Sequence, residues 1–230
     1  MSRKLNIIYY AAILFIGFTI NARAEGGITI QGTRLIYPLN QNQLTLSISN
    51  TSAKDSFLVQ SWVEDWQENK TKDILVVPPL YLSSPEDENL VRLVLLNKNL
   101  PIDRETLYYF VAKGIPSIDE SKKNESAIRI ALASRIKLFV RPDRLPLSSD
   151  DAQKKLNFLY DKDGLIIKNT TPYYITIVDM WYGKRNVKSI MIPPFSEKKL
   201  LCNYAKESKV SFSTINDYGA TTKKQIITVK

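Results

Sequence analysis

One long alternating stretch constrains the fold of this 230-residue chain more than any other feature. From Ser126 to Pro142 the sequence reads SAIRIALASRIKLFVRP, with apolar residues at most even positions and several cations at odd ones. A period of two residues is typical of a β-strand. The alternation runs over 14 residues, Ala127–Val140, whereas strands usually have about 5–6. A small sandwich cannot easily cover so long an apolar stripe, so the excess length raises the question of what binds it.

Shorter alternating segments, separated by turn residues, recur through the rest of the chain. They form two series of about seven candidate strands with turn signals every ~8–12 residues, which is typical of β-sandwiches of immunoglobulin type. The sequence therefore predicts an all-β protein with two such domains. The segment Arg141–Gln153 carries two prolines and a polar run that can break strand pairing. We place the linker near Arg141–Ser149, between domains at residues 25–142 and 143–230.

The first 24 residues have the features of a secretory signal peptide. Arg3 and Lys4 form a short basic region, an apolar run follows to about Ile20, and Ala22 and Ala24 supply small residues two apart. The alternative, a membrane anchor, is disfavoured because the run is short and ends at this small-x-small site. We expect cleavage after Ala24, which lowers the net charge from +9 to +6. No second span of ~18 apolar residues follows, so we expect the mature protein to be soluble, with no membrane anchor.

The composition argues against catalysis, metal binding and nucleic-acid binding. The chain has no histidine, which removes the commonest general base and the commonest metal ligand. No glycine-rich phosphate loop is visible, and the single cysteine, Cys202, cannot form an intramolecular disulfide. The cations are scattered, and an exported protein meets little nucleic acid. We therefore expect no enzymatic activity, no catalytic residue, no cofactor, no metal and no nucleic-acid partner.

Six motifs in order along the chain resemble those of the periplasmic chaperones of chaperone–usher pilus assembly. They are GTRLIYP (Gly32–Pro38), LPIDRETLYYF (Leu100–Phe110), IALASRIKLFVRP (Ile130–Pro142), NTTPYYITI (Asn169–Ile177), IPPFSEK (Ile192–Lys198) and INDYGA (Ile215–Ala220). The resemblance implies two immunoglobulin-like domains in a boomerang with an interdomain cleft. It also implies a periplasmic protein that caps pilus subunits and delivers them to an outer-membrane usher. Each subunit lacks its last strand, and the chaperone lends its own, which is called donor-strand complementation.

The resemblance assigns the donor side chains to Ile128, Ile130 and Leu132. Burying an aliphatic side chain is worth about 1.5–3 kcal/mol, so three give roughly 5–9 kcal/mol before ordering costs. The alternative is that these residues face the chaperone's own core. We expect Ile136, Leu138 and Val140, further along the same stripe, to pack inward.

Two sets of charged residues also match the family. Arg34 and Lys137 match the cleft pair that anchors the C-terminal carboxylate of the subunit. Such an anchor would set the register of the donor strand, because a slip of one residue turns every side chain to the other face. Glu105, Arg141 and Asp217 match an interdomain ion-pair network, which we expect to hold the cleft geometry without touching the subunit.

The loop before the donor strand, roughly Pro116–Glu125, is short to moderate, so the chain resembles the short-loop branch of the family. The alternative function is a secreted immunoglobulin-like structural or adhesive subunit of a surface fibre. Such a subunit should carry its own alternating N-terminal extension, and GGITIQGT is too short for that. The sequence leaves open which fimbria is served, what Cys202 does, and whether the idle protein forms a self-capping homodimer.

Overall fold

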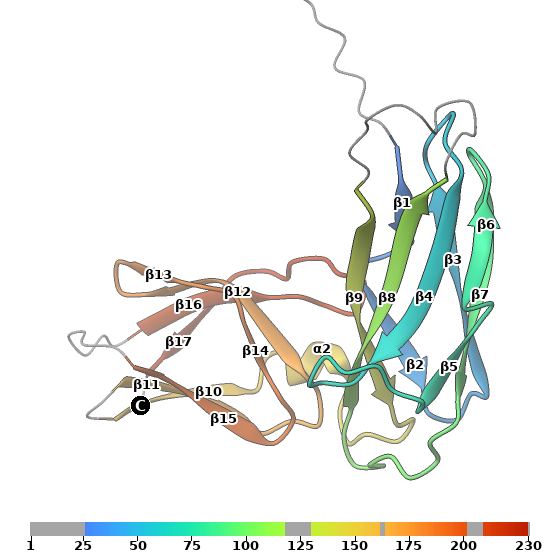
Figure 1. The fold of residues 1–230 in the computed structure, drawn as a ribbon. Coiled ribbons are helices and arrows are strands. Elements are labelled where there is room, and N and C mark those ends of the chain that lie inside the picture. The colour runs from blue at the N-terminus through green and yellow to red at the C-terminus, as the bar shows by residue number, and fades with distance from the viewer. Residues whose placement is uncertain (1–25, 118–129, 162–163, 202–208, 230) are drawn as a thin grey trace, which may run out of the picture.

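The structure is a computed structural model that describes residues 26–117, 130–161, 164–201 and 209–229. It is built almost entirely of strands, arranged as two β-sandwiches whose long axes cross at a wide angle (Figure 1). The prediction of an all-β fold with two sandwich domains is confirmed. No helix in the described ranges is long and apolar enough to cross a membrane. Residues 1–24, assigned to the signal peptide, lie outside these ranges.

The first domain packs two sheets face to face. One has the strand order β1-β3-β7-β5 and the other β2-β9-β8-β4-β6. Its strands are β1 (Ile28–Ile30), β2 (Arg34–Pro38), β3 (Gln43–Asn50), β4 (Phe57–Glu64), β5 (Ile74–Val77), β6 (Leu80–Ser83), β7 (Glu88–Leu95), β8 (Thr106–Pro116) and β9 (Leu132–Arg141). Alternate residues face inward, as in most sandwiches. The core includes the fully buried Tyr37, Phe110, Val91 and Leu138.

The chain changes sheets between β1 and β2, and this leaves part of β9 with a described neighbouring strand on one side alone. β1 pairs with β3 in one sheet, whereas β2 pairs in parallel with β9 in the other. Gly32, with a φ of 91°, lies at the change of direction, in the left-handed region that glycine enters freely. β2 covers only Lys137–Arg141 of β9. The preceding residues, Leu132–Ile136, pair with β8 on one side and with no other described strand.

The long predicted strand is shorter in the structure. β9 is Leu132–Arg141, and neither Ile130 nor Ala131 belongs to a strand. Its ladder with β8 begins at the pair Gly114–Leu132, because the next residues of β8 lead to Pro116, which has no amide to donate. Residues 118–129, and with them Ile128, lie outside the described ranges.

The second domain is a smaller sandwich. One sheet has the order β10-β11-β15, and the other runs β13-β12-β16-β17 with β14 also paired to β12. Its strands are β10 (Leu156–Asp161), β11 (Gly164–Asn169), β12 (Ile175–Tyr182), β13 (Arg185–Val187), β14 (Ile190–Ile192), β15 (Ser196–Leu201), β16 (Lys209–Thr214) and β17 (Gln225–Thr228). Phe158 and Phe212 stack in its core with ring centroids 5.0 Å apart.

The connection between the domains contains one short helix and no strand. β9 ends at Arg141, and α2 (Ser149–Ala152) begins where the expected linker ends. The hydroxyl of Ser148 accepts a hydrogen bond from the amide of Asp151 and so caps the helix.

Candidate functional site

Arg34 and Lys137 lie side by side at the junction of the two domains. β2 and β9 run parallel, and Arg34 is the register partner of Lys137. Neighbouring strands are ~4.8 Å apart and register partners project from the same face of a sheet. The two cations therefore share one face, at the point where β2 begins and the outer edge of β9 becomes free.

The guanidinium of Arg34 is half buried and only partly satisfied. Its Nη1 donates to the backbone carbonyl of Ile215 in the second domain at 3.3 Å, and it lies 6.0 Å from the ring centroid of Phe139. Its Nε is buried and has no hydrogen-bond partner. Burial lowers the pKa of Arg34, against the opposing charges of Asp217 and Glu105. A buried donor without a partner is costly, so this group is well suited to an external acceptor.

Lys137 also reaches across to the second domain. Its Nζ donates to Oγ1 of Thr176 at 3.2 Å. Burial lowers the pKa of Lys137, and the nearby positive charge of Arg34 lowers it further. Within the described part of the chain, neither Arg34 nor Lys137 has a carboxylate within ion-pair distance.

β9 carries a row of three cations, and among the described residues the middle one has no carboxylate within ion-pair distance. Arg135 pairs with Glu64 and Glu68, each at 2.9 Å, and stacks 3.8 Å from the ring centroid of Tyr109. Arg141, at the other end, pairs with two further carboxylates, described below. Lys137 between them keeps its positive charge uncompensated among the described residues.

An open groove of about 380 Å³ lies beside the two cations. Strands of the first domain and the turn after β16 both contribute to it. Its lining residues are Thr33, Arg34, Tyr109, Arg135, Ile136, Lys137, Ile215 and Gly219. Two convergent cationic donors in a partly desolvated groove favour an anion, and a carboxylate can accept from both.

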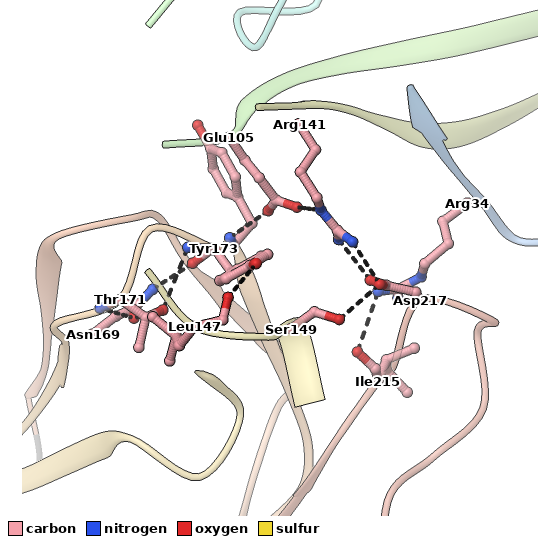
Figure 2. Close-up of polar contacts among 11 residues, drawn as sticks. Arg34, Glu105, Arg141, Leu147, Ser149, Asn169, Thr171, Tyr173, Ile215 and Asp217 are labelled. Carbon is pink, nitrogen blue, oxygen red and sulfur yellow. Dashed lines mark hydrogen bonds and ion pairs between the residues drawn. The ribbon is translucent and has the colours of Figure 1, made fainter. Parts of the chain in front are cut away.

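Of the three residues expected to form an interdomain network, Arg141 lies between Glu105 and Asp217 and bonds to both (Figure 2). Nε of Arg141 donates to Glu105 at 2.7 Å, and its two terminal nitrogens donate to the carboxylate of Asp217, each at 2.7 Å. The hydroxyl of Ser149 also donates to Asp217, at 2.8 Å. The amide of Tyr174 donates to Glu105, at 2.8 Å. One arginine at the end of β9 thus joins carboxylates from both domains.

Burial acts differently on the two carboxylates. Burial raises the pKa of Glu105, which is 3% exposed, and the charge of Arg141 only partly opposes this. Burial also acts to raise the pKa of Asp217, but hydrogen bonds from Arg141 and Ser149 and the charge of Arg141 outweigh it, so the pKa is lowered. Removing Arg141 would therefore leave the buried Glu105 and the partly buried Asp217, one in each domain, without their main partner.

Two of the three residues expected to be donor side chains lie in the described ranges, and both are exposed to solvent. Ile130 is 67% exposed and Leu132 is 74% exposed, so neither faces the core of the first domain. Leu138 and Val140, on the same stripe, are fully buried, and Ile136 packs against the core, as expected. The apolar stripe is therefore buried at the end of β9 that pairs with β2, and exposed at the end where β9 has no described second neighbour.

Sequence reasoning missed the second-domain groups that meet the cations. Thr176 lies in the motif NTTPYYITI and Ile215 begins INDYGA. Their contacts could not be predicted, because a backbone carbonyl and a threonine hydroxyl carry no distinctive signal. No cluster of three or more potential metal ligands occurs in the ranges the structure describes. Cys202 lies outside them.

Two family models together match most of the chain. Residues 27–146 match the N-terminal domain of the PapD pili and flagellar-assembly chaperones, and residues 151–226 match the PapD C-terminal domain. Among curated relatives, the chaperone protein FimC of Escherichia coli K12 is 37% identical over 225 residues, covering 97% of this chain and 93% of the relative. The probable fimbrial chaperone protein ElfD of the same strain is 38% identical over 223 residues, covering 96% and 95%.

Solved structures give the same result. The periplasmic chaperone SfaE matches with a TM-score of 0.76 and 33% identity, covering 87% of this chain and 98% of that one. A structure of the Salmonella enterica SafA pilin in complex with the SafB chaperone matches with a TM-score of 0.78 and 25% identity, covering 90% and 98%. The resemblance stated from the motifs is confirmed: this chain belongs to the family of pilus-assembly chaperones.

Proposed function

We propose that this protein is a periplasmic chaperone that binds a fimbrial subunit by adding its own β9 edge to the subunit's incomplete sheet. The observation that carries the proposal is the unpaired edge of Leu132–Ile136, which lies next to two cations without a carboxylate partner among the described residues. The edge provides backbone groups for pairing, and the exposed stripe provides apolar side chains. The two cations provide a site that can bind the end of the partner's chain.

Strand addition suits such an edge physically. An exposed row of N–H and C=O groups is a template for pairing with another chain. Main-chain hydrogen bonds then provide affinity, and pockets for alternate side chains provide specificity, a mode for which chaperone–pilin pairs are known cases. Ile130 and Leu132 would fill the subunit's groove, together with Ile128 from the preceding segment.

The cations would fix the register of the added strand. We assign Arg34 and Lys137 to the C-terminal carboxylate of the subunit, because charge-assisted hydrogen bonds from two donors are stronger than neutral ones. With the carboxylate fixed, each apolar side chain of β9 meets one defined pocket, since a slip of one residue would reverse every side chain. Glu105, Arg141 and Asp217 would hold the two domains at the angle that the anchor requires.

The family favours this function over a structural or adhesive fibre subunit. The SafB chaperone was solved with a pilin, which supports a pilus subunit as the partner here. Membership of the family supports the further proposal of delivery to an outer-membrane usher, and the features of residues 1–24 support the proposal of export to the periplasm. Release by strand exchange needs neither a nucleotide nor a catalytic residue, so we propose a non-enzymatic role.

Co-purification from the periplasm tests this function. The tagged chaperone is expressed with the fimbrial subunits encoded beside it, and the bound proteins are identified by mass spectrometry. We expect the wild type to retain a subunit, and Arg34→Ala and Lys137→Ala to lose it while remaining folded. Lys154→Ala is the matched control, because Lys154 is exposed and its described ion pair is with the nearby Asp151. Normal recovery of the subunit with both anchor variants would contradict the proposal.

A further inference from the structure

Both anchor cations are held by acceptors that belong to the second domain. Oγ1 of Thr176, on β12, accepts from Nζ of Lys137 at 3.2 Å, and Thr176 is only 6% exposed. The carbonyl of Ile215 accepts from Nη1 of Arg34 at 3.3 Å. Each cation therefore belongs to the first domain, and an acceptor in the second domain orients its side chain.

The two acceptors form part of one ladder. The amide of Ile215 donates to the carbonyl of Thr176 at 3.0 Å, so the two residues are bonded to each other directly. Two residues beyond Ile215, the carboxylate of Asp217 bonds to Arg141. Two hydrogen-bonded segments of the second domain thus present the acceptors to the cations, and the segment with Ile215 is itself bonded to the end of β9 through Asp217.

The chemistry of the acceptors matters for binding an anion. A lysine side chain has four flexible bonds and loses much rotamer freedom when it is fixed. A hydroxyl can hold the ammonium in place without neutralising it, whereas a carboxylate in the same position would cancel the charge. Orienting a donor before its ligand arrives improves affinity, because less freedom is lost on binding.

We propose that Thr176 is a positioning residue for the carboxylate anchor, so that the anchor is built by both domains. The inference rests on the proposed function, in which Lys137 binds the C-terminal carboxylate of a subunit. Thr176 acts through Lys137, and Ile215 acts in the same way on Arg34. The affinity for a chain-terminal carboxylate then depends on the alignment of the domains.

The test compares a carboxylate with an amide at the end of one probe. The probe is an N-acetylated peptide of alternating valine and serine, made once with a free C-terminal carboxylate and once with a C-terminal amide. The ratio of the two dissociation constants measures the contribution of the anchor. We expect the wild type to prefer the acid peptide, Thr176→Val to reduce this preference roughly five- to tenfold, as for one lost hydrogen bond, and Thr176→Ser to retain it.

The ratio separates positioning from folding. A purely structural defect weakens both peptides equally and leaves the ratio unchanged, so an unchanged ratio in Thr176→Val would overturn the role of Thr176. Thr176→Ala, which is smaller and adds no bulk, serves if the valine variant does not fold, with the same expected loss. Lys137→Ala should abolish the preference. A wild type without any preference would overturn the anchor itself, and with it this inference.

Discussion

Arg34 and Lys137 are register partners on two strands of one domain, yet each donates its hydrogen bond to the other domain. Two like charges on neighbouring strands repel, and no described carboxylate lies within ion-pair distance of either of them. Their pKa values are both lowered by burial. Such an arrangement costs stability in the free protein, which is expected of a site that waits for an anion from outside.

The donor residues should matter for binding and not for stability. Ile130→Glu and Leu132→Glu place charges on exposed positions, where substitutions usually change the free energy of unfolding by no more than about 0.5 kcal/mol. The same charges would have to enter the apolar groove of the subunit, where an unpaired charge is strongly unfavourable. We expect loss of subunit binding in pull-down, with a melting temperature near that of the wild type.

Leu138→Ala is the matched control on the same stripe of β9. Leu138 is fully buried, so its truncation should cost about 2–5 kcal/mol of folding stability. A large drop in melting temperature for Ile130→Glu, comparable with that of Leu138→Ala, would mean that Ile130 belongs to the chaperone's own core.

Arg141→Ala should destabilise the protein strongly. It leaves the buried carboxylate of Glu105 without its cation, and breaking one side of a buried pair costs about 3–5 kcal/mol. Arg135→Ala breaks a more exposed pair and should cost less than about 1 kcal/mol. Urea unfolding of both variants measures the difference. Equal and small effects would show that the Arg141 network does not hold the domains together.

Subunit binding should weaken at alkaline pH. The pKa of Lys137 in the free protein lies below its usual value of 10.5, and a bound carboxylate would raise it by favouring the charged form. Binding therefore takes up a proton, and affinity falls as pH rises through the free-state pKa of Lys137. By the same linkage, the free protein gains folding stability in this window, because its folded state binds fewer protons than the unfolded one.

A titration of affinity between about pH 7 and pH 10 checks this, with Lys137→Arg as the comparison. Arginine stays charged throughout, so the arginine variant should keep a constant affinity over the range. A parallel loss in both proteins would assign the pH dependence to another group.

Gly219 should be intolerant of any side chain. Its φ is 82°, and a Cβ there would overlap the hydroxyl of Thr33 in the first domain. We expect Gly219→Ala to lower the melting temperature by several degrees and to weaken subunit binding, because the same turn carries Ile215 and Asp217. Gly27→Ala is the control, since a Cβ at Gly27 has open space around it. Equal melting temperatures for both variants would contradict a tight contact between Gly219 and Thr33.

The alternation of side chains was enough to predict the architecture, because burial on one face of a strand leaves a period of two in the sequence. It could not locate the end of β9. Ile130 and Leu132 follow the same alternation as Leu138 and Val140, yet the first pair is exposed and the second is buried. The buried pair lies where β9 has both β2 and β8 as neighbours, and the exposed pair lies beyond β2, a relation that depends on contacts far apart in the chain.

The residues of the site were predicted from the family motifs more than from their own chemistry. Arg34 and Lys137 are ordinary strand residues by pattern, and only the resemblance distinguished them. The structure adds what no motif states, namely that the Arg34 Nε is buried without a partner and that Thr176 and Ile215 hold the two cations. These relations depend on the angle between the domains, which the sequence pattern does not specify.

Amide hydrogen exchange on β9 tests the central claim most directly. In the free chaperone, the amides of Leu132–Ile136 that are not bonded to β8 should exchange rapidly, and in the complex with a fimbrial subunit they should become strongly protected. Amides in the buried half of the strand, at Leu138 and Val140, should be protected in both states. Rapid exchange along Leu132–Ile136 while the subunit remains bound would show that the chaperone does not add this edge to the subunit's sheet.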